Sequence, residues 1–133
     1  MSLRRRHLIL LICALPVLGA CKNRERVLDE QNQSLQSLDA TTKAVTEAWL
    51  SGAVSAAYAR TALESTEQLL EKQRAALAAP PDMLADPSAA RISQAQEQLA
   101  RSLAVLLKAV DRADPAAARQ QLARESHSPS ELP

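Results

Sequence analysis

The stretch WLSGAVSAAY, residues 49–58, decides whether the first half of this chain is one rod or two packed helices. Uncharged residues recur every seven positions on both sides of this stretch, at Leu28, Leu35, Thr42, Trp49, Ala56, Leu63, Leu70 and Leu77. Such an unbroken heptad register favours one continuous helix of about 55 residues, about 80 Å long.

Gly52 and Ser55 favour a turn instead. Glycine readily adopts the left-handed conformation that ends many helices, and serine accepts a backbone N–H hydrogen bond at the start of a new helix. A glycine inside a helix also costs about 1 kcal/mol. We therefore favour a turn between two helices, residues 25–50 and 56–78, and the continuous rod remains the alternative.

Two further helices are predicted after Pro80-Pro81, which must end the second helix. One covers residues 87–112, where large apolar residues share one face: Ile92, Leu99, Leu103, Leu106 and Val110. A short one covers residues 115–125. Each begins with the dipeptide Asp-Pro, at residues 86–87 and 114–115, which places a carboxylate at the N-cap and a proline at the first helical position.

The sequence thus predicts an all-α fold, a small antiparallel helical bundle of three long helices plus a short fourth. The bundle domain spans residues 25–125, and residues 126–133 lack an apolar pattern and are expected to be disordered. Four polar residues fall on the apolar seams, where such residues can fix the register of the helices: Gln31, Thr42, Thr66 and Gln73.

The N-terminus has the layout of a secretory signal. Three arginines, Arg4 to Arg6, precede an uninterrupted apolar run from Leu8 to Ala20. Because a helix needs about 20 apolar residues to span a bilayer, this run is too short to be a transmembrane segment. We expect residues 1–20 to be a cleaved signal peptide.

The end of this signal resembles the lipobox of bacterial lipoproteins, an aliphatic residue and two small ones before a cysteine: Leu18, Gly19, Ala20 and Cys21. The resemblance implies cleavage between Ala20 and Cys21 and acyl chains on Cys21, of which two or three hold a protein firmly on a membrane. Residues 21–24 would form the lipidated tether. Lys22, in place of aspartate, implies the outer membrane, with the domain facing the periplasm.

Composition and charge argue against several other functions. The chain has 16 Lys and Arg against 15 Asp and Glu, and one Trp, one Tyr and no Phe, so it lacks the basic and aromatic surface that binds nucleic acids. Signal removal and lipidation would leave neither Cys13 nor Cys21 for a disulfide. His127 would be the only remaining histidine, and we expect no enzyme activity, no metal and no cofactor.

The stretch from Ala48 to Ala59 carries no charge and holds both aromatic residues of the mature chain, Trp49 and Tyr58. These two are the candidate contacts for a partner, because exposed apolar patches and aromatic residues mark interaction sites. Alternatively, Trp49 simply closes the end of the core. The favoured function is a non-catalytic, lipid-anchored interaction or structural module that binds another envelope protein, and the alternative is a helical binding protein for a small apolar or amphiphilic ligand.

Overall fold

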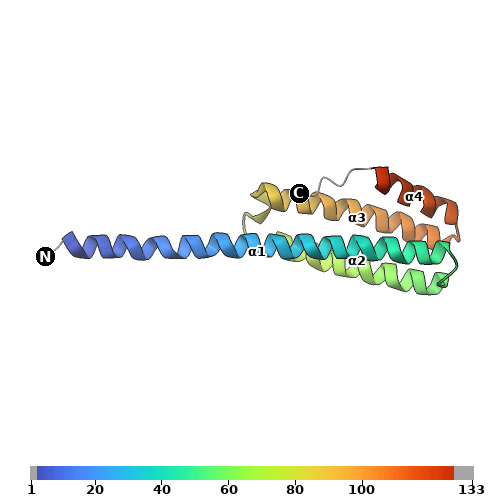
Figure 1. Cartoon of the computed structure of the whole chain (residues 1–133), viewed down its shortest axis with the longest axis horizontal. Coiled ribbons are helices and arrows are strands. Elements are labelled where there is room, and N and C mark those ends of the chain that lie inside the picture. Colours follow the sequence, from blue (N-terminus) through green and yellow to red (C-terminus); the bar gives the residue numbers. More distant parts are fainter. Residues whose placement is uncertain (1–2, 128–133) are drawn as a thin grey trace.

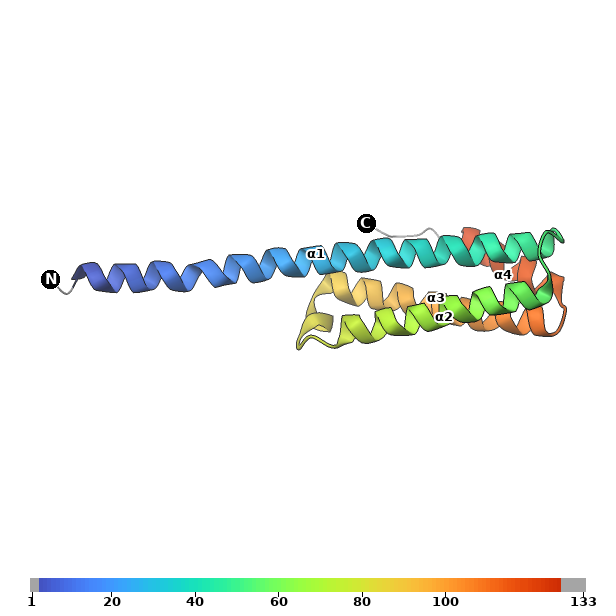
Figure 2. The same cartoon turned by 90° about the horizontal axis from the view of Figure 1, so that it is seen from below.

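The computed structural model of the chain describes residues 3–127 and, among them, the side chains of residues 22–127. This part of the protein folds into α1 (Leu3–Leu50), α2 (Ala56–Ala78), α3 (Pro87–Asp111) and α4 (Pro115–His127), with a short 3-10 helix, η1 (Met83–Ala85), between α2 and α3. Helix α2 runs antiparallel to α1 and α3, and the shorter α4 packs on α3 and α1 (Figures 1 and 2). The predicted all-α bundle of three long helices and a short fourth is confirmed.

The contested boundary is a turn, and the continuous rod is wrong. Helix α1 ends at Leu50, and Gly52 has the left-handed φ of +77°. The N–H of Ala53 donates to the carbonyl of Ala48 at 2.8 Å, and the N–H of Gly52 donates to that of Trp49 at 3.0 Å. This pair of bonds is the Schellman motif, which satisfies carbonyls that the end of a helix leaves without partners.

The start of α2 is equally well defined. Ser55 is its N-cap, and the Ser55 hydroxyl accepts a hydrogen bond from the N–H of Tyr58 at 3.2 Å. The leucines of α2 then pack into the same core as those of α1. The heptad spacing therefore occurs in both helices because each faces the same core, and not because they form one helix.

The two Asp-Pro dipeptides begin α3 and α4 as predicted. The Asp86 carboxylate accepts a hydrogen bond from the N–H of Ser88 at 2.8 Å, and the Asp114 carboxylate accepts one from the N–H of Ala117 at 3.1 Å. Each carboxylate satisfies a backbone donor that has no partner inside the helix, next to the positive end of the helix dipole.

Helix α1 is longer than predicted. We expected it to begin at residue 25, whereas it begins at Leu3 and continues without a break through the predicted tether, residues 21–24. In the described range no helix, α1 included, combines the length and apolar character that crossing a membrane requires. Leu28 is the first buried residue of α1 among those whose side chains are described, so the helix projects well beyond the bundle (Figure 1). Cleavage after Ala20 remains a prediction.

Helix α4 is also longer than predicted. It ends at His127 rather than at residue 125, so the first two residues of the expected disordered segment are helical. The rest of that segment, residues 128–133, lies outside the described residues.

The core is a column of leucines from the three long helices, separated by alanines. Leu63 and Leu70 of α2 and Leu103 of α3 are completely buried, and so are Ala59, Ala89 and Ala118. Such small residues let neighbouring helices approach closely. Ala118 is the one fully buried residue of α4, so apolar burial holds this helix less firmly than the other three.

Two of the four polar seam residues, Thr42 and Thr66, are buried, and Gln31 and Gln73 are half-buried. The Thr42 hydroxyl donates to the carbonyl of Leu38 at 2.8 Å, and the Thr66 hydroxyl donates to the carbonyl of Ala62 at 2.9 Å. Because each threonine bonds within its own helix, these two residues do not set the register between helices.

Candidate functional site

The α1–α2 turn lies at the end of the bundle farthest from the N-terminal half of α1 (Figures 1 and 2). Continuous helix joins Cys21 to Leu50, which places the turn about 44 Å from Cys21 at 1.5 Å per residue. We call this end, formed by residues 48–59, the tip. If Cys21 carries the anchor, the tip is therefore the membrane-distal end of the molecule.

The two aromatic candidates reach the tip from different helices and differ in accessibility. Tyr58 lies in the first turn of α2 and is 59% exposed. Trp49 lies in the last turn of α1, is half-buried and packs against the core. Trp49 thus closes the end of the core, and Tyr58 is the aromatic side chain of the tip that is open to solvent.

A second turn strengthens the same end. Helix α3 also ends in a Schellman motif, in which Asp114 N–H donates to the Ala109 carbonyl at 2.8 Å and Ala113 N–H donates to the Val110 carbonyl at 3.1 Å. Ala113 takes the left-handed place usually held by glycine, with a φ of +50°. Hydrogen-bonded turns thus end both helix pairs at this end of the bundle.

Ion pairs lie beside the tip and along α2. The Arg60 guanidinium and the Asp111 carboxylate are 2.5 Å apart and join α2 to the end of α3. Glu71 pairs with Arg74 at 2.8 Å within α2. Because these groups are substantially exposed, each pair contributes at most about 1 kcal/mol. The Arg60–Asp111 pair therefore places solvated charge beside the uncharged tip, and the Glu71–Arg74 pair lies farther along α2.

At the other end of the molecule, the lipobox residues lie within α1: Leu18, Gly19, Ala20 and Cys21. Their side chains are outside the described ones. The three basic residues that follow, Lys22, Arg24 and Arg26, are exposed, and Arg26 pairs with Glu30 at 3.1 Å.

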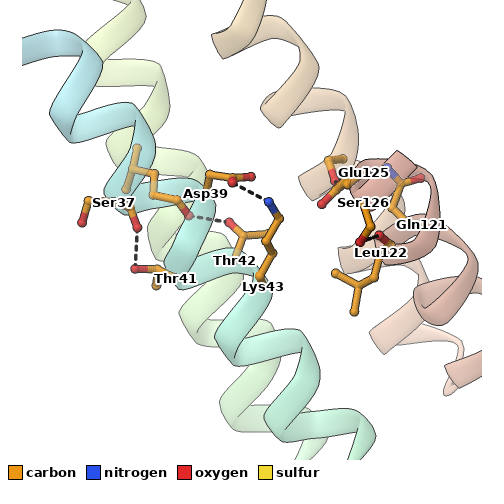
Figure 3. Close-up of polar contacts among 11 residues, drawn as sticks. Ser37, Asp39, Thr41, Thr42, Lys43, Gln121, Leu122, Glu125 and Ser126 are labelled. Carbon is orange, nitrogen blue, oxygen red and sulfur yellow. Dashed lines mark hydrogen bonds and ion pairs between the residues drawn. The ribbon is translucent and has the colours of Figure 1, made fainter. Parts of the chain in front are cut away.

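A small polar cluster, which no pattern in the sequence indicates, attaches α4 to α3. The buried Ser102 hydroxyl of α3 donates to the Glu125 carboxylate of α4, and the Gln121 amide donates to both side chains at 3.2 Å. Figure 3 shows Gln121 and Glu125 together on α4, while the bonds drawn on α1 stay within that helix. This cluster compensates for the small apolar area under α4.

A layer of amides crosses the core nearer the N-terminal end of the bundle. Gln96 of α3 is almost completely buried, and its amide donates to the Gln31 side chain of α1 at 3.4 Å. Asn32 of α1 and Gln73 of α2 are separated from the α1–α2 turn by similar numbers of residues, so they lie at the same height along the bundle axis. Their buried side-chain oxygens have no hydrogen-bond partner in the structure. Unlike the seam threonines, these amides can distinguish one helix register from another.

Groups suited to catalysis or metal binding are dispersed. In the part of the chain that the structure describes, no three residues among His, Cys, Asp and Glu gather as metal ligands would. His127 is the last residue of α4, with its Nδ1 atom 2.7 Å from the carbonyl oxygen of Ala123 in the same helix.

Comparison with known protein families, with curated proteins and with solved structures finds no match for this chain. The lipobox-like sequence lies in the N-terminal half of α1, and the uncharged tip with its two aromatic residues lies where α1 ends and α2 begins.

Proposed function

We propose that the mature protein is a lipid-anchored, non-catalytic interaction module of the bacterial envelope. The observation that carries this proposal is the sequence LGAC, residues 18–21, which follows a basic start and a short apolar run. Lys22 favours the outer membrane, with the bundle facing the periplasm. Acyl chains on Cys21 would hold the protein firmly, since each buried methylene contributes about 0.8 kcal/mol.

The position of the tip supports the second half of the proposal. An α1 helix that is continuous from Cys21 to Leu50 supports the tip about 44 Å from the anchor, without a flexible linker between them. Tyr58 is the kind of exposed aromatic residue that dominates protein–protein binding energies. The partner is another envelope protein with a binding surface at this distance from the membrane.

The anchor is tested by substituting the two cysteines of the precursor one at a time. Cys21→Ser should abolish the incorporation of radiolabelled palmitate and should leave residues 1–20 attached or the protein soluble. Cys13→Ser is the matched control, because Cys13 lies inside the signal and should be lost with it. Labelling of the Cys21→Ser variant at the parent level would contradict the proposal.

The partner surface is tested by a photo-crosslinking residue placed at position 58 or at position 69 in the acylated protein. Both native side chains are exposed, Tyr58 to 59% and Leu69 to 49%, but Leu69 lies in the middle of α2. A discrete crosslinked species is expected from position 58 only. Crosslinking of equal yield from both positions would argue against the tip as the docking surface.

A further inference from the structure

The turn between α2 and α3, residues 79–86, lies at the end of the bundle from which the N-terminal half of α1 projects (Figures 1 and 2). Met83 is buried and fixes this turn to the core, whereas its neighbour Leu84 is 46% exposed. Backbone hydrogen bonds hold the turn in shape, from Ala85 N–H to the Asp82 carbonyl at 3.2 Å and from Asp86 N–H to the Met83 carbonyl at 3.0 Å. An ordered turn with an exposed leucine therefore lies at the end of the bundle nearest the predicted anchor.

The distance from this turn to the membrane follows from α1. Cys21 precedes Leu28, where burial in the bundle begins, by seven residues of helix, which correspond to about 10 Å. The headgroup layer beyond the hydrocarbon boundary is itself about 5–8 Å thick on each side of a bilayer. Packed helices lie about 9 Å apart, so a tilt of α1 by about 30° toward α2 and α3 lowers the membrane-facing ends of those two helices by about 4–5 Å. This tilt brings the turn between α2 and α3 into the headgroup layer.

We propose that the η1 turn is a second membrane contact, with Leu84 entering the headgroup layer of the bilayer that holds the acyl chains of Cys21. This inference rests on the proposed function, since it requires the anchor. The two contacts together set the tilt of the bundle and direct the tip away from the membrane. A single flexible attachment would leave that tilt undefined.

The charges on the turn itself indicate that its own contact with the membrane is apolar rather than electrostatic. Asp82 is exposed on the turn itself, and the Asp86 carboxylate caps α3. Carboxylates are repelled by anionic lipids, so negative lipid charge does not help this turn to reach the membrane and the contact must come from Leu84. A bilayer of phosphatidylcholine alone is expected to suffice.

The mature chain offers a clean way to test this contact. Its one cysteine, Cys21, is blocked by lipid in the proposed protein, so an introduced cysteine can be labelled alone. Three variants are made, Leu84→Cys and the controls Tyr58→Cys and Leu69→Cys. In each, a fluorophore is attached to the introduced cysteine, and the acylated protein is reconstituted into phosphatidylcholine vesicles. All three native side chains are exposed, so the substitutions leave the core intact.

Quenching by spin-labelled lipid is the measurement. The fluorophore at position 84 should be quenched about two-fold or more compared with positions 58 and 69, with and without phosphatidylglycerol in the vesicles. Equal quenching at positions 84 and 58, in protein that floats with the vesicles, would overturn the second contact and leave the anchor intact. Quenching at position 84 that requires phosphatidylglycerol would overturn the apolar contact. Parent protein that lacks acyl chains and does not float would overturn both proposals.

Discussion

Replacing Ala113 with glycine should stabilise the protein. Ala113 ends α3 with a φ of +50°, in a conformation that costs a residue with a Cβ about 1–2 kcal/mol. Glycine removes this cost but also gives the unfolded chain more freedom, which offsets about 0.4–1 kcal/mol of the gain. The expected net stabilisation of Ala113→Gly is about 0.5–1 kcal/mol.

Gly52→Ala is the reciprocal change at the corresponding place of the α1–α2 turn. Gly52 has a φ of +77°, and a Cβ built there would meet nothing within 4 Å, so only the backbone conformation opposes the substitution. Gly52→Ala should therefore destabilise the protein by about 0.5–1 kcal/mol. The two variants test one physical effect with opposite signs.

Urea unfolding of the chain from Lys22 onward, followed by far-ultraviolet circular dichroism, measures both effects. The midpoint should shift while the slope stays constant, since neither change alters the surface exposed on unfolding. Ala123→Gly, on an exposed position within α4, is the control and should cost about 1 kcal/mol. A loss of stability in Ala113→Gly like that in Ala123→Gly would refute the left-handed turn at Ala113.

Three further predictions concern the rest of the fold. Leu63→Ala should reduce the free energy of unfolding by about 2–5 kcal/mol because Leu63 is completely buried, whereas Leu69→Ala, at a 49% exposed position, should cost less than about 1 kcal/mol; similar losses in urea melts would contradict the assigned core. Asp86→Ala should cost about 1 kcal/mol through loss of the α3 N-cap, and an unchanged melting temperature would argue against that bond. Chelators and reducing agents should leave the melting temperature unchanged, since the described residues hold no metal-ligand cluster; a shift with EDTA would reveal a metal site.

The α1–α2 turn and the starts of α2, α3 and α4 could be predicted because they depend on local chemistry. Gly52, Ser55 and the two Asp-Pro dipeptides act through their own backbone or through donors within three residues. The heptad pattern alone could not separate rod from hairpin, because a shared core imposes the same spacing on two helices as a continuous seam imposes on one.

The polar contacts between helices could not be predicted. Gln96 looks like any other glutamine in the sequence, and only the position of α1 buries it and supplies Gln31 as acceptor. The same holds for Ser102, which meets Glu125 because α4 turns back onto α3. At the tip, the sequence indicated both aromatic residues, but their unequal exposure depends on how α1 and α2 pack.

The short length of α4 has a consequence for how the bundle opens. Its side-chain hydrogen bonds to α3, from Gln121 and Glu125, reach Ser102, and α4 lies beside the second half of α3 only (Figure 1), so the first half of α3 has no fourth helix beside it. The same half contains the amide layer, in which the buried oxygens of Asn32 and Gln73 have no partner. Local stability should therefore be unequal, and hydrogen exchange should be faster at backbone amides 92–99 than at 103–110. When the protein is heated or exposed to denaturant, the bundle should unfold first at the end near Cys21, while the helices at the tip stay packed.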